Sequence, residues 1–154
     1  MHHYQLTLNN HFKKERNKLV STIVTMEIPA SPENVWQLIG GFNSLPDWLP
    51  YIPNSELSEG GRVRSLANPD GDVIIERLEA FNPNDRFYTY SIMQAPFPVT
   101  NYQSTIRVQE HSDSNKSIVV WTGSFTPVDV TDQEVINLFH GIYQDGLEAL
   151  RDAF

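Results

Sequence analysis

Apolar and polar side chains alternate along much of the chain with the period of two that is typical of β-strands. The first such segment, Val20–Ile28, is rich in β-branched residues and places Val24 and Ile28 on the same face. The same alternation predicts further strands at residues 55–58, 62–67, 72–80, 86–93, 102–109 and 117–125. Turn sequences separate these segments, so successive strands are expected to pair as an antiparallel meander.

Between the first two predicted strands the hydrophobic period changes from two to that of a helix. Ser31 is a favoured N-cap residue, Pro32 fits the first helical position, and about two turns of amphipathic pattern follow before Gly40. Residues 42–53 contain three prolines and several large aromatic residues. This composition favours one short turn of helix near residues 44–48, followed by irregular chain.

The longest helical pattern lies at the C-terminal end of the sequence. Thr131 and Glu134 have the spacing of a capping box, in which each side chain satisfies one free backbone amide. The apolar spacing that follows predicts a helix of about 20 residues, roughly 30 Å long. Gly141 and Gly146 lie inside it, and each costs about 1 kcal/mol relative to alanine. Their presence indicates close packing at these positions, or space kept for another group.

The order of these elements predicts an α+β fold. One strand, one or two short helices, about six further strands and a long C-terminal helix would give a curved antiparallel sheet of six to seven strands wrapped on that helix. Such a sheet has more concave surface than one helix can fill. We therefore expect a cavity between sheet and helix, where ligands are usually found.

Several sequence strings also carry a family resemblance. They are Ala30-Ser-Pro-Glu-Asn-Val-Trp36, Phe42-Asn-Ser-Leu-Pro-Asp-Trp48, Glu76-Arg-Leu78, Tyr90-Ser-Ile92, Val99-Thr-Asn-Tyr102 and Ile142-Tyr-Gln-Asp-Gly-Leu147. Their order resembles the helix-grip superfamily of Bet v 1 allergens, START lipid-transfer domains, polyketide cyclases and plant abscisic acid receptors, and most of all its bacterial polyketide cyclase/dehydrase-like branch. The resemblance covers about residues 20–153. It implies a pocket for a hydrophobic or amphipathic small molecule between the sheet and the long helix.

The resemblance also implies positions for the pocket residues. Inward-facing side chains are expected at Glu76, Tyr90, Ile92 and Tyr102. A latch loop is expected at Phe97-Pro-Val99 and a facing gate loop at residues 68–71. The latch and gate strings of the plant receptors are absent, and Gly123 and Leu147 stand where those receptors carry an inward Glu and a pocket Asn. These departures argue against an abscisic acid receptor and against its phosphatase partnership.

Composition narrows the chemistry that such a pocket can offer. The 154 residues include no Cys, which excludes disulfides, thiolate zinc sites, iron–sulfur clusters and cysteine nucleophiles. It also fits a reducing compartment, so we expect a cytoplasmic location. Outside the first 18 residues the histidines are His111 and His140, which lack metal-ligand spacing. No metal and no cofactor are predicted.

The formal net charge of −8 combines two unlike parts. Residues 1–18 carry four basic and one acidic side chain, a net of +3, whereas the rest carries seven basic and eighteen acidic side chains, a net of −11. We predict a flexible basic tail over residues 1–18 and a single domain over 19–154. An acidic body is not expected to bind nucleic acid. No apolar run is long enough to predict a transmembrane segment.

Glu76 is the most informative single residue, because it shares a strand face with Ile74 and Leu78. A carboxylate on an apolar face is costly unless it is paired. One interpretation is a pocket acid, with a pKa raised by burial, that orients a ligand or moves a proton. The alternatives are an ion pair with Arg64 or Arg107, or an edge position that faces water.

Further candidates are aromatic. Buried tyrosines can offer phenols to a ligand or serve as core residues, and Trp121 and Phe125 flank Gly123 to give a wall with a gap. Trp48 would close one end of the cavity, and His140 is expected to be satisfied or to face solvent. The full set of predicted ligand-binding residues is Arg64, Glu76, Tyr88, Tyr90, Ile92, Phe97, Val99, Tyr102, Trp121, Phe125, Phe139 and Tyr143.

Three functions fit these features. The first is binding of a lipid- or polyketide-like molecule, which we favour because no residue pair is a clear acid–base dyad. The second is a cyclase or dehydratase-type enzyme that uses Glu76, with Tyr90 or Tyr102, for proton transfer. The third is a protein-interaction module that acts through the pocket-mouth loops around residues 46–53 and 97–99.

Overall fold

A seven-stranded antiparallel sheet is the framework of the molecule. The computed structural model describes residues 18–154, and its strands lie in the order β1-β7-β6-β5-β4-β3-β2. The strands are β1 (Val20–Ile28), β2 (Asn54–Ser58), β3 (Val63–Ala67), β4 (Val73–Asn82), β5 (Phe87–Gln94), β6 (Val99–Glu110) and β7 (Ser117–Pro127). The helices are α2 (Pro32–Ile39), α3 (Leu45–Trp48), the 3₁₀ turn η1 (Glu59–Gly61) and α4 (Asp132–Asp152).

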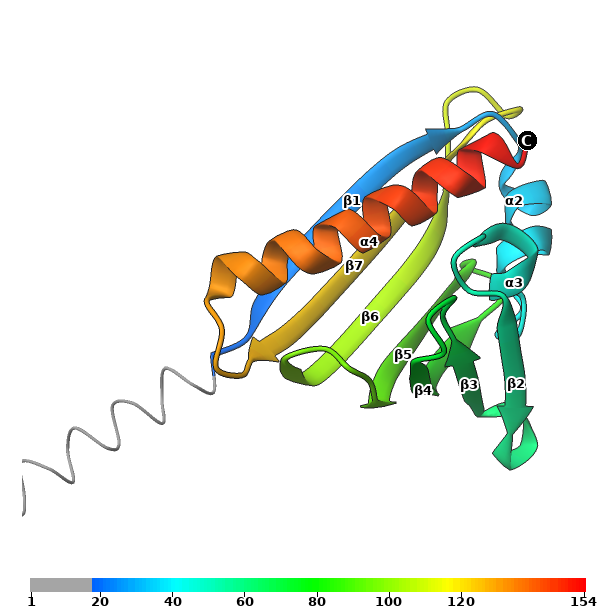
Figure 1. Cartoon of the computed structure of the whole chain (residues 1–154). Helices are drawn as coiled ribbons and strands as arrows, with labels where there is room; N and C mark the ends of the chain where they lie inside the picture. The colour runs from blue at the N-terminus through cyan, green and yellow to red at the C-terminus, as the bar shows by residue number, and fades with distance from the viewer. Residues whose placement is uncertain (1–17) are drawn as a thin grey trace, which may run out of the picture.

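The predicted meander and α+β helix-grip fold are confirmed. Strands β2 to β7 each pair with their neighbours along the chain, and β1 returns to pair with β7. Figure 1 shows α4 crossing the sheet over β1, β7 and β6, while β4, β3 and β2 curve away from it. The short helices α2 and α3 lie at the end of the sheet near the C-terminus of α4 (Figure 1).

The predicted strand bounds agree with those of the structure to within about two residues, except at the start of β6. The strand begins at Val99 rather than at Tyr102, and its first residues pair with the end of β7. The register then shifts between Thr100 and Gln103, and Asn101 has a φ of 53°. This irregularity breaks the alternation of side chains, so the pattern of the sequence does not reveal the first three residues of the strand.

Helices α2 and α4 begin at the residues that their capping signals predict. The Ser31 hydroxyl accepts a hydrogen bond from the Asn34 amide at 3.3 Å. At α4 the Glu134 amide donates to the Thr131 hydroxyl at 3.2 Å, and the Thr131 amide donates to the Glu134 carboxylate at 2.8 Å. The predicted capping box is therefore complete, and it fixes where the long helix begins.

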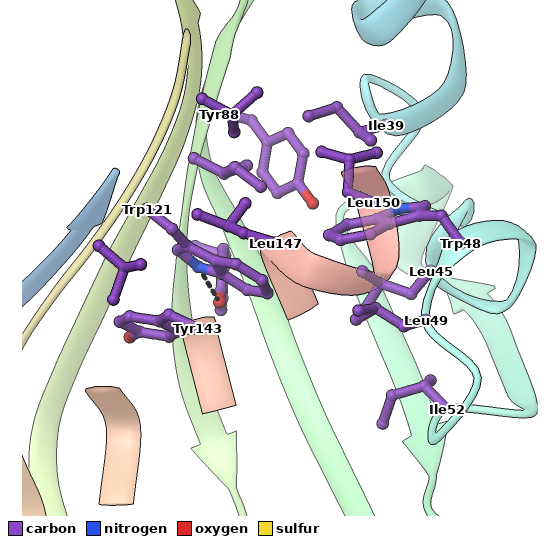
Figure 2. Packing of buried hydrophobic residues seen from close by; sticks show 14 of the residues in the cluster. Ile39, Leu45, Trp48, Leu49, Ile52, Tyr88, Trp121, Tyr143, Leu147 and Leu150 are labelled. Carbon is purple, nitrogen blue, oxygen red and sulfur yellow. Dashed lines mark hydrogen bonds between the residues drawn. The ribbon is translucent and has the colours of Figure 1, made fainter. Parts of the chain in front are cut away.

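The core lies between α4, the concave face of the sheet and the short helices. Figure 2 shows Trp121, Tyr143 and Leu147 facing Trp48 and Leu45 across this core. The two indole rings lie 5.8 Å apart between centroids, and the Trp121 ring stacks on Tyr143 at 4.8 Å. Leu147 is fully buried in this core, and burial of a leucine side chain stabilises the fold by about 1.5–3 kcal/mol.

The two glycines of α4 have different surroundings. A Cβ on Gly146 would lie 2.7 Å from a ring carbon of Trp121 and 2.9 Å from the Tyr51 hydroxyl, which donates to the Ile142 carbonyl at 3.1 Å. A Cβ on Gly141 would meet nothing within 4 Å. Close packing, one of the two expected reasons, therefore applies to Gly146 and not to Gly141.

The gap predicted at Gly123 is filled by protein. A Cβ there would collide with the Tyr143 hydroxyl and would lie 3.1 Å from the ring carbon that carries it. The absence of a side chain at Gly123 thus lets the Tyr143 ring pack directly against β7. The contact draws α4 onto the sheet at this point.

The predicted basic tail, residues 1–18, lies outside the described residues except for Lys18, whose ammonium is 3.6 Å from the Asp132 carboxylate. Across residues 18–154, no helix has the length and apolar character needed to cross a membrane.

These contacts predict opposite effects of alanine at the two helix glycines. Gly146→Ala should lower the free energy of unfolding by about 1–3 kcal/mol, because overpacking against Trp121 outweighs the gain in helix propensity. Gly141→Ala is the matched control and should raise it by up to about 1 kcal/mol. Urea denaturation followed by circular dichroism measures both, and a stabilised Gly146→Ala variant would contradict close packing of Gly146 against Trp121.

Candidate functional site

A cavity of about 290 Å³ lies between part of α4 and the concave face of the sheet. Side chains from the sheet, α3, α4 and three loops surround it. Its lining consists of Leu45, Leu49, Tyr51, Ile52, Arg64, Leu66, Asn68, Pro69, Ile74, Glu76, Tyr90, Ile92, Phe97, Tyr102, Trp121, Phe139, Ile142 and Tyr143. The volume lies near the lower end of the range for small-molecule pockets, about 300–1,000 Å³.

Most of the predicted site residues meet at this cavity. Those that line it are Arg64, Glu76, Tyr90, Ile92, Phe97, Tyr102, Trp121, Phe139 and Tyr143. Phe97 comes from the expected latch loop, and Asn68 and Pro69 come from the expected gate loop. Whether these side chains contact a ligand stays a prediction.

Three predicted site residues lie outside the lining. Tyr88 is 1% exposed and Phe125 is fully buried, so both pack behind the cavity wall. Val99 is half-buried at the first position of β6. Trp48 is also absent from the lining, although it was expected to close the cavity. In each case alternation or spacing indicates an inward direction, but the neighbouring side chains decide which residue reaches the cavity.

The residues that sequence reasoning missed are mainly aliphatic. Leu45, Leu49 and Ile52 come from α3 and the chain after it, and Leu66 and Ile74 come from β3 and β4. Alternation already places Leu66 and Ile74 on the inner face of their strands. The other three belong to the proline-rich segment, whose path the hydrophobic pattern does not predict.

A buried ion pair joins β3 and β4 at one side of the cavity. Arg64 and Glu76 are direct cross-strand partners, and Arg64 Nε donates to Glu76 Oε1 at 2.8 Å. Their side chains are only 1% and 8% exposed. Glu76 therefore both lines the cavity and pairs with Arg64, and at 6% exposed it does not lie at an edge that faces water. Whether it orients a ligand or moves a proton stays a prediction. Arg107, the other expected partner, packs instead on the Phe87 ring at 4.1 Å.

Arg64 is held by more than Glu76. Its Nη1 donates to the Phe42 carbonyl at 3.0 Å and to the Tyr88 hydroxyl at 3.3 Å. The guanidinium also lies 4.2 Å from the centroid of the Phe42 ring and 4.8 Å from that of Tyr90. These cation–π contacts and hydrogen bonds fix the orientation of the planar group.

Burial perturbs the pKa of both members of the pair. It raises the pKa of the Glu76 carboxyl, and the adjacent guanidinium opposes that rise. For Arg64, burial acts to lower the pKa, but the Tyr88 oxygen and the Glu76 carboxylate outweigh it and leave the pKa above its ordinary value. Because a guanidinium does not release its proton in proteins, a neutral carboxyl beside it would leave a buried charge without compensation. We therefore describe the pair as ionised.

A row of phenols extends from the Arg64–Glu76 pair toward α4, and the pair and the phenols together form a polar strip. The Trp121 indole nitrogen donates to the Tyr90 hydroxyl at 3.2 Å and to the Ser104 hydroxyl at 3.0 Å. The Tyr102 hydroxyl is hydrogen-bonded to the Tyr143 hydroxyl. Tyr90, Tyr102 and Tyr143 come from β5, β6 and α4, so this part of the site exists only in the folded chain.

Burial keeps these phenols protonated. It raises the pKa of Tyr90 and of Tyr102 well above the ordinary value, and it raises that of Tyr143 to about 12. A phenol with a raised pKa donates and accepts hydrogen bonds but is a poor source of phenolate. The tyrosines are therefore suited to orienting a ligand oxygen rather than to acting as bases.

The two histidines among the described residues, His111 and His140, are not part of the cavity lining. His140 is exposed, with its Nδ1 3.4 Å from the Thr22 hydroxyl, which agrees with the expected solvent-facing position. His111 Nε2 lies 2.6 Å from the Glu27 carboxylate in a separate surface cluster. Among residues 18–154, no group of three or more His, Cys, Asp or Glu side chains is arranged to hold a metal ion.

Comparison with known proteins agrees with this geometry. Residues 20–154 match the family described as polyketide cyclase/dehydrase and lipid transport. Among curated proteins, abscisic acid receptor PYL1 of Arabidopsis thaliana is 25% identical over 114 residues. That match covers 69% of this chain and 52% of the receptor, so the chain spans about half the length of this curated relative.

Solved structures share the whole fold. The protein XoxI from Bacillus cereus is 72% identical with a TM-score of 0.86, over 88% of this chain and 95% of that one. A Bacillus thuringiensis protein is 70% identical with a TM-score of 0.87, over 88% and 98% of the two chains. A START superfamily protein from Mycobacterium smegmatis has a TM-score of 0.70 at 17% identity, over 88% and 95%, and shares the fold alone.

Removing one member of the Arg64–Glu76 pair should destabilise the fold much more than removing both. Glu76→Leu should lower the free energy of unfolding by about 3–5 kcal/mol, because it leaves Arg64 charged and buried without a partner. The double variant Arg64→Met/Glu76→Leu should recover most of that loss, since apolar residues can replace a buried pair. Urea denaturation of the single and double variants measures the difference, and a double variant as unstable as Glu76→Leu would show that the pairing is not what matters.

The buried phenols predict a loss of stability in alkali. Between its ordinary pKa of 10.0 and its raised value of about 12, Tyr143 keeps its proton in the folded state and loses it in the unfolded state. The free energy of unfolding should therefore fall across this window, by about 1.4 kcal/mol per pH unit for each such tyrosine. Urea denaturation at a series of pH values, with phenolate absorbance, measures the slope. Tyr143→Phe should reduce it, and an unchanged slope would contradict the assignment.

Proposed function

Because the chain belongs to the polyketide cyclase/dehydrase and lipid transport family, we propose that it binds a hydrophobic or amphipathic small molecule in the cavity between the sheet and α4. One observation carries the proposal: the cavity has walls of aliphatic and aromatic side chains around a single, fixed ion pair. Apolar walls favour burial of an apolar molecule, and a few fixed polar groups orient it.

The proposed roles of the lining residues follow from their chemistry. Ile92, Phe97 and Phe139 would contact the apolar part of the ligand. Arg64 and Glu76 would meet its polar group, and Tyr90, Tyr102 and Tyr143 would offer hydroxyls along the same strip. A lipid- or polyketide-like molecule of modest size suits a cavity of about 290 Å³.

The relatives support binding of a small molecule but do not identify the ligand of this chain. The curated relative is, by its name, a receptor for abscisic acid. This chain lacks the latch and gate strings of such receptors, so neither that ligand nor a phosphatase partner is part of the proposal. The absence of nucleic-acid binding, expected from the acidic body, stays a prediction. So does a cytoplasmic location, which rests on the lack of cysteine.

A cyclase or dehydratase-type enzyme is the second candidate. One observation favours it: Glu76 is a cavity carboxyl whose pKa burial raises, a usual feature of proton-transfer groups. Its hydrogen bond to Arg64 and the protonated state of the nearby phenols favour binding over catalysis. If the protein is an enzyme of this kind, Glu76→Gln should abolish turnover and retain binding.

Neighbouring residues of β5 offer a matched test of binding in the cavity. Ile92 lines the cavity, whereas Met93 is 53% exposed. Ile92→Trp should fill part of the cavity and weaken binding of the neutral fluorescent probe N-phenyl-1-naphthylamine by about tenfold or more. Met93→Trp adds the same bulk outside and should leave binding unchanged.

Fluorescence titration measures the affinity of both variants, and native mass spectrometry of freshly purified wild-type protein would reveal a co-purified apolar molecule. The proposal fails if the wild-type protein binds neither this probe nor any of a panel of hydrophobic ligands. Equal loss of affinity in the two variants would place the binding site elsewhere.

A further inference from the structure

The charges that line the cavity are balanced. Among residues 18–154, its lining contains one cationic side chain, Arg64, and one carboxylate, Glu76. These two are paired with each other at 2.8 Å. The cavity therefore presents a fixed dipole to a ligand rather than a free positive charge.

Within the described residues, Nε and Nη1 of Arg64 are already engaged, which leaves only Nη2 to donate to an anion. Nε is engaged by Glu76, and Nη1 is shared between the Phe42 carbonyl and the Tyr88 hydroxyl. The Phe42 and Tyr90 rings also lie against the guanidinium, so it cannot turn to present its bidentate edge without breaking these contacts.

Two atoms of the pair remain without a hydrogen bond to the described chain, namely Arg64 Nη2 and Glu76 Oε2. The occluded polar side-chain atoms without a partner in residues 18–154 are Ser44 Oγ, Trp48 Nε1 and Ser117 Oγ. Nη2 and Oε2 are not among them, and both residues line the cavity. Nη2 is a donor and Oε2 is an acceptor.

We infer that the ligand is electrically neutral and presents a hydroxyl or enol group to Arg64 and Glu76. This inference rests on the proposed binding function and specifies its ligand class. A hydroxyl can accept a hydrogen bond from Nη2 and donate one to Oε2 at the same time, which satisfies both free atoms. A carboxylate could accept from Nη2, but its second oxygen would lie beside the Glu76 carboxylate, and two like charges in one buried site repel strongly.

Charges near the cavity also disfavour an anionic ligand. The gate turn that supplies Asn68 and Pro69 also carries Asp70 and Asp72, both exposed. Asp145 lies close enough to the lining residue Tyr51 to raise its pKa, in addition to the larger effect of burial. Acidic groups around a cavity lower the local concentration of anions and favour entry of neutral molecules.

Two probes with the same ring system test the inference on the wild-type protein. 2-Naphthol is neutral near neutral pH, and 2-naphthoate is its carboxylate counterpart. Displacement of N-phenyl-1-naphthylamine, with calorimetry as a check, should show 2-naphthol binding at least about tenfold more tightly. Equal or tighter binding of 2-naphthoate overturns the inference and leaves the proposed function standing. If the wild-type protein binds none of the three compounds, the proposed function fails and the inference with it.

A charge substitution at the pair should reduce or abolish the preference for 2-naphthol. Glu76→Gln removes the repelling carboxylate and frees Arg64, so affinity for 2-naphthoate should rise by about tenfold while that for 2-naphthol changes less. Glu79→Gln makes the same charge change at an exposed position of β4 and should leave the preference unchanged. Circular dichroism establishes that both variants fold. A folded Glu76→Gln variant with no gain for 2-naphthoate overturns the inference, and the wild-type comparison decides it alone if that variant does not fold.

Discussion

The buried contact between Arg64 and Glu76 constrains this molecule more than any other single interaction. Both side chains have left water, which costs several kcal/mol per ion, so each must keep its partner and its hydrogen bonds. That requirement fixes the register of β3 against β4 and ties the chain at Phe42 to the sheet through its carbonyl. It also leaves a charged dipole beside apolar walls, where a cavity can persist instead of collapsing into a continuous apolar core.

Helix α4 accounts for the other side of the cavity. One helix covers the β1–β7–β6 half of the curved sheet, and the remaining strands diverge from it (Figure 1). Two glycines draw the helix close: Gly123 admits the Tyr143 ring, and Gly146 admits Trp121. Where α4 meets β7 the packing is tight, and the space left over lies between α4 and the strands that carry the ion pair.

The polar groups of the site form one strip across five strands and a helix. It runs from Arg64 and Glu76 through Tyr90 to the pair of Tyr102 and Tyr143, with Trp121 donating to Tyr90. Burial holds the phenols in their neutral form, so the strip offers hydrogen bonds of fixed direction and no ready base. This chemistry suits recognition of a mostly apolar molecule, in keeping with the family to which the chain belongs.

The sequence by itself determined the local structure, because alternation, capping residues and turns are properties of neighbouring residues. It predicted β1, the capping box at Thr131 and the inward direction of Glu76. Contacts between residues far apart in the sequence decided which side chains meet in the site. The sequence allowed Arg64 or Arg107 as the partner of Glu76, and only strand register selected Arg64. Tyr102 and Tyr143, 41 residues apart, meet because α4 folds back over the sheet, and no local pattern encodes that distance.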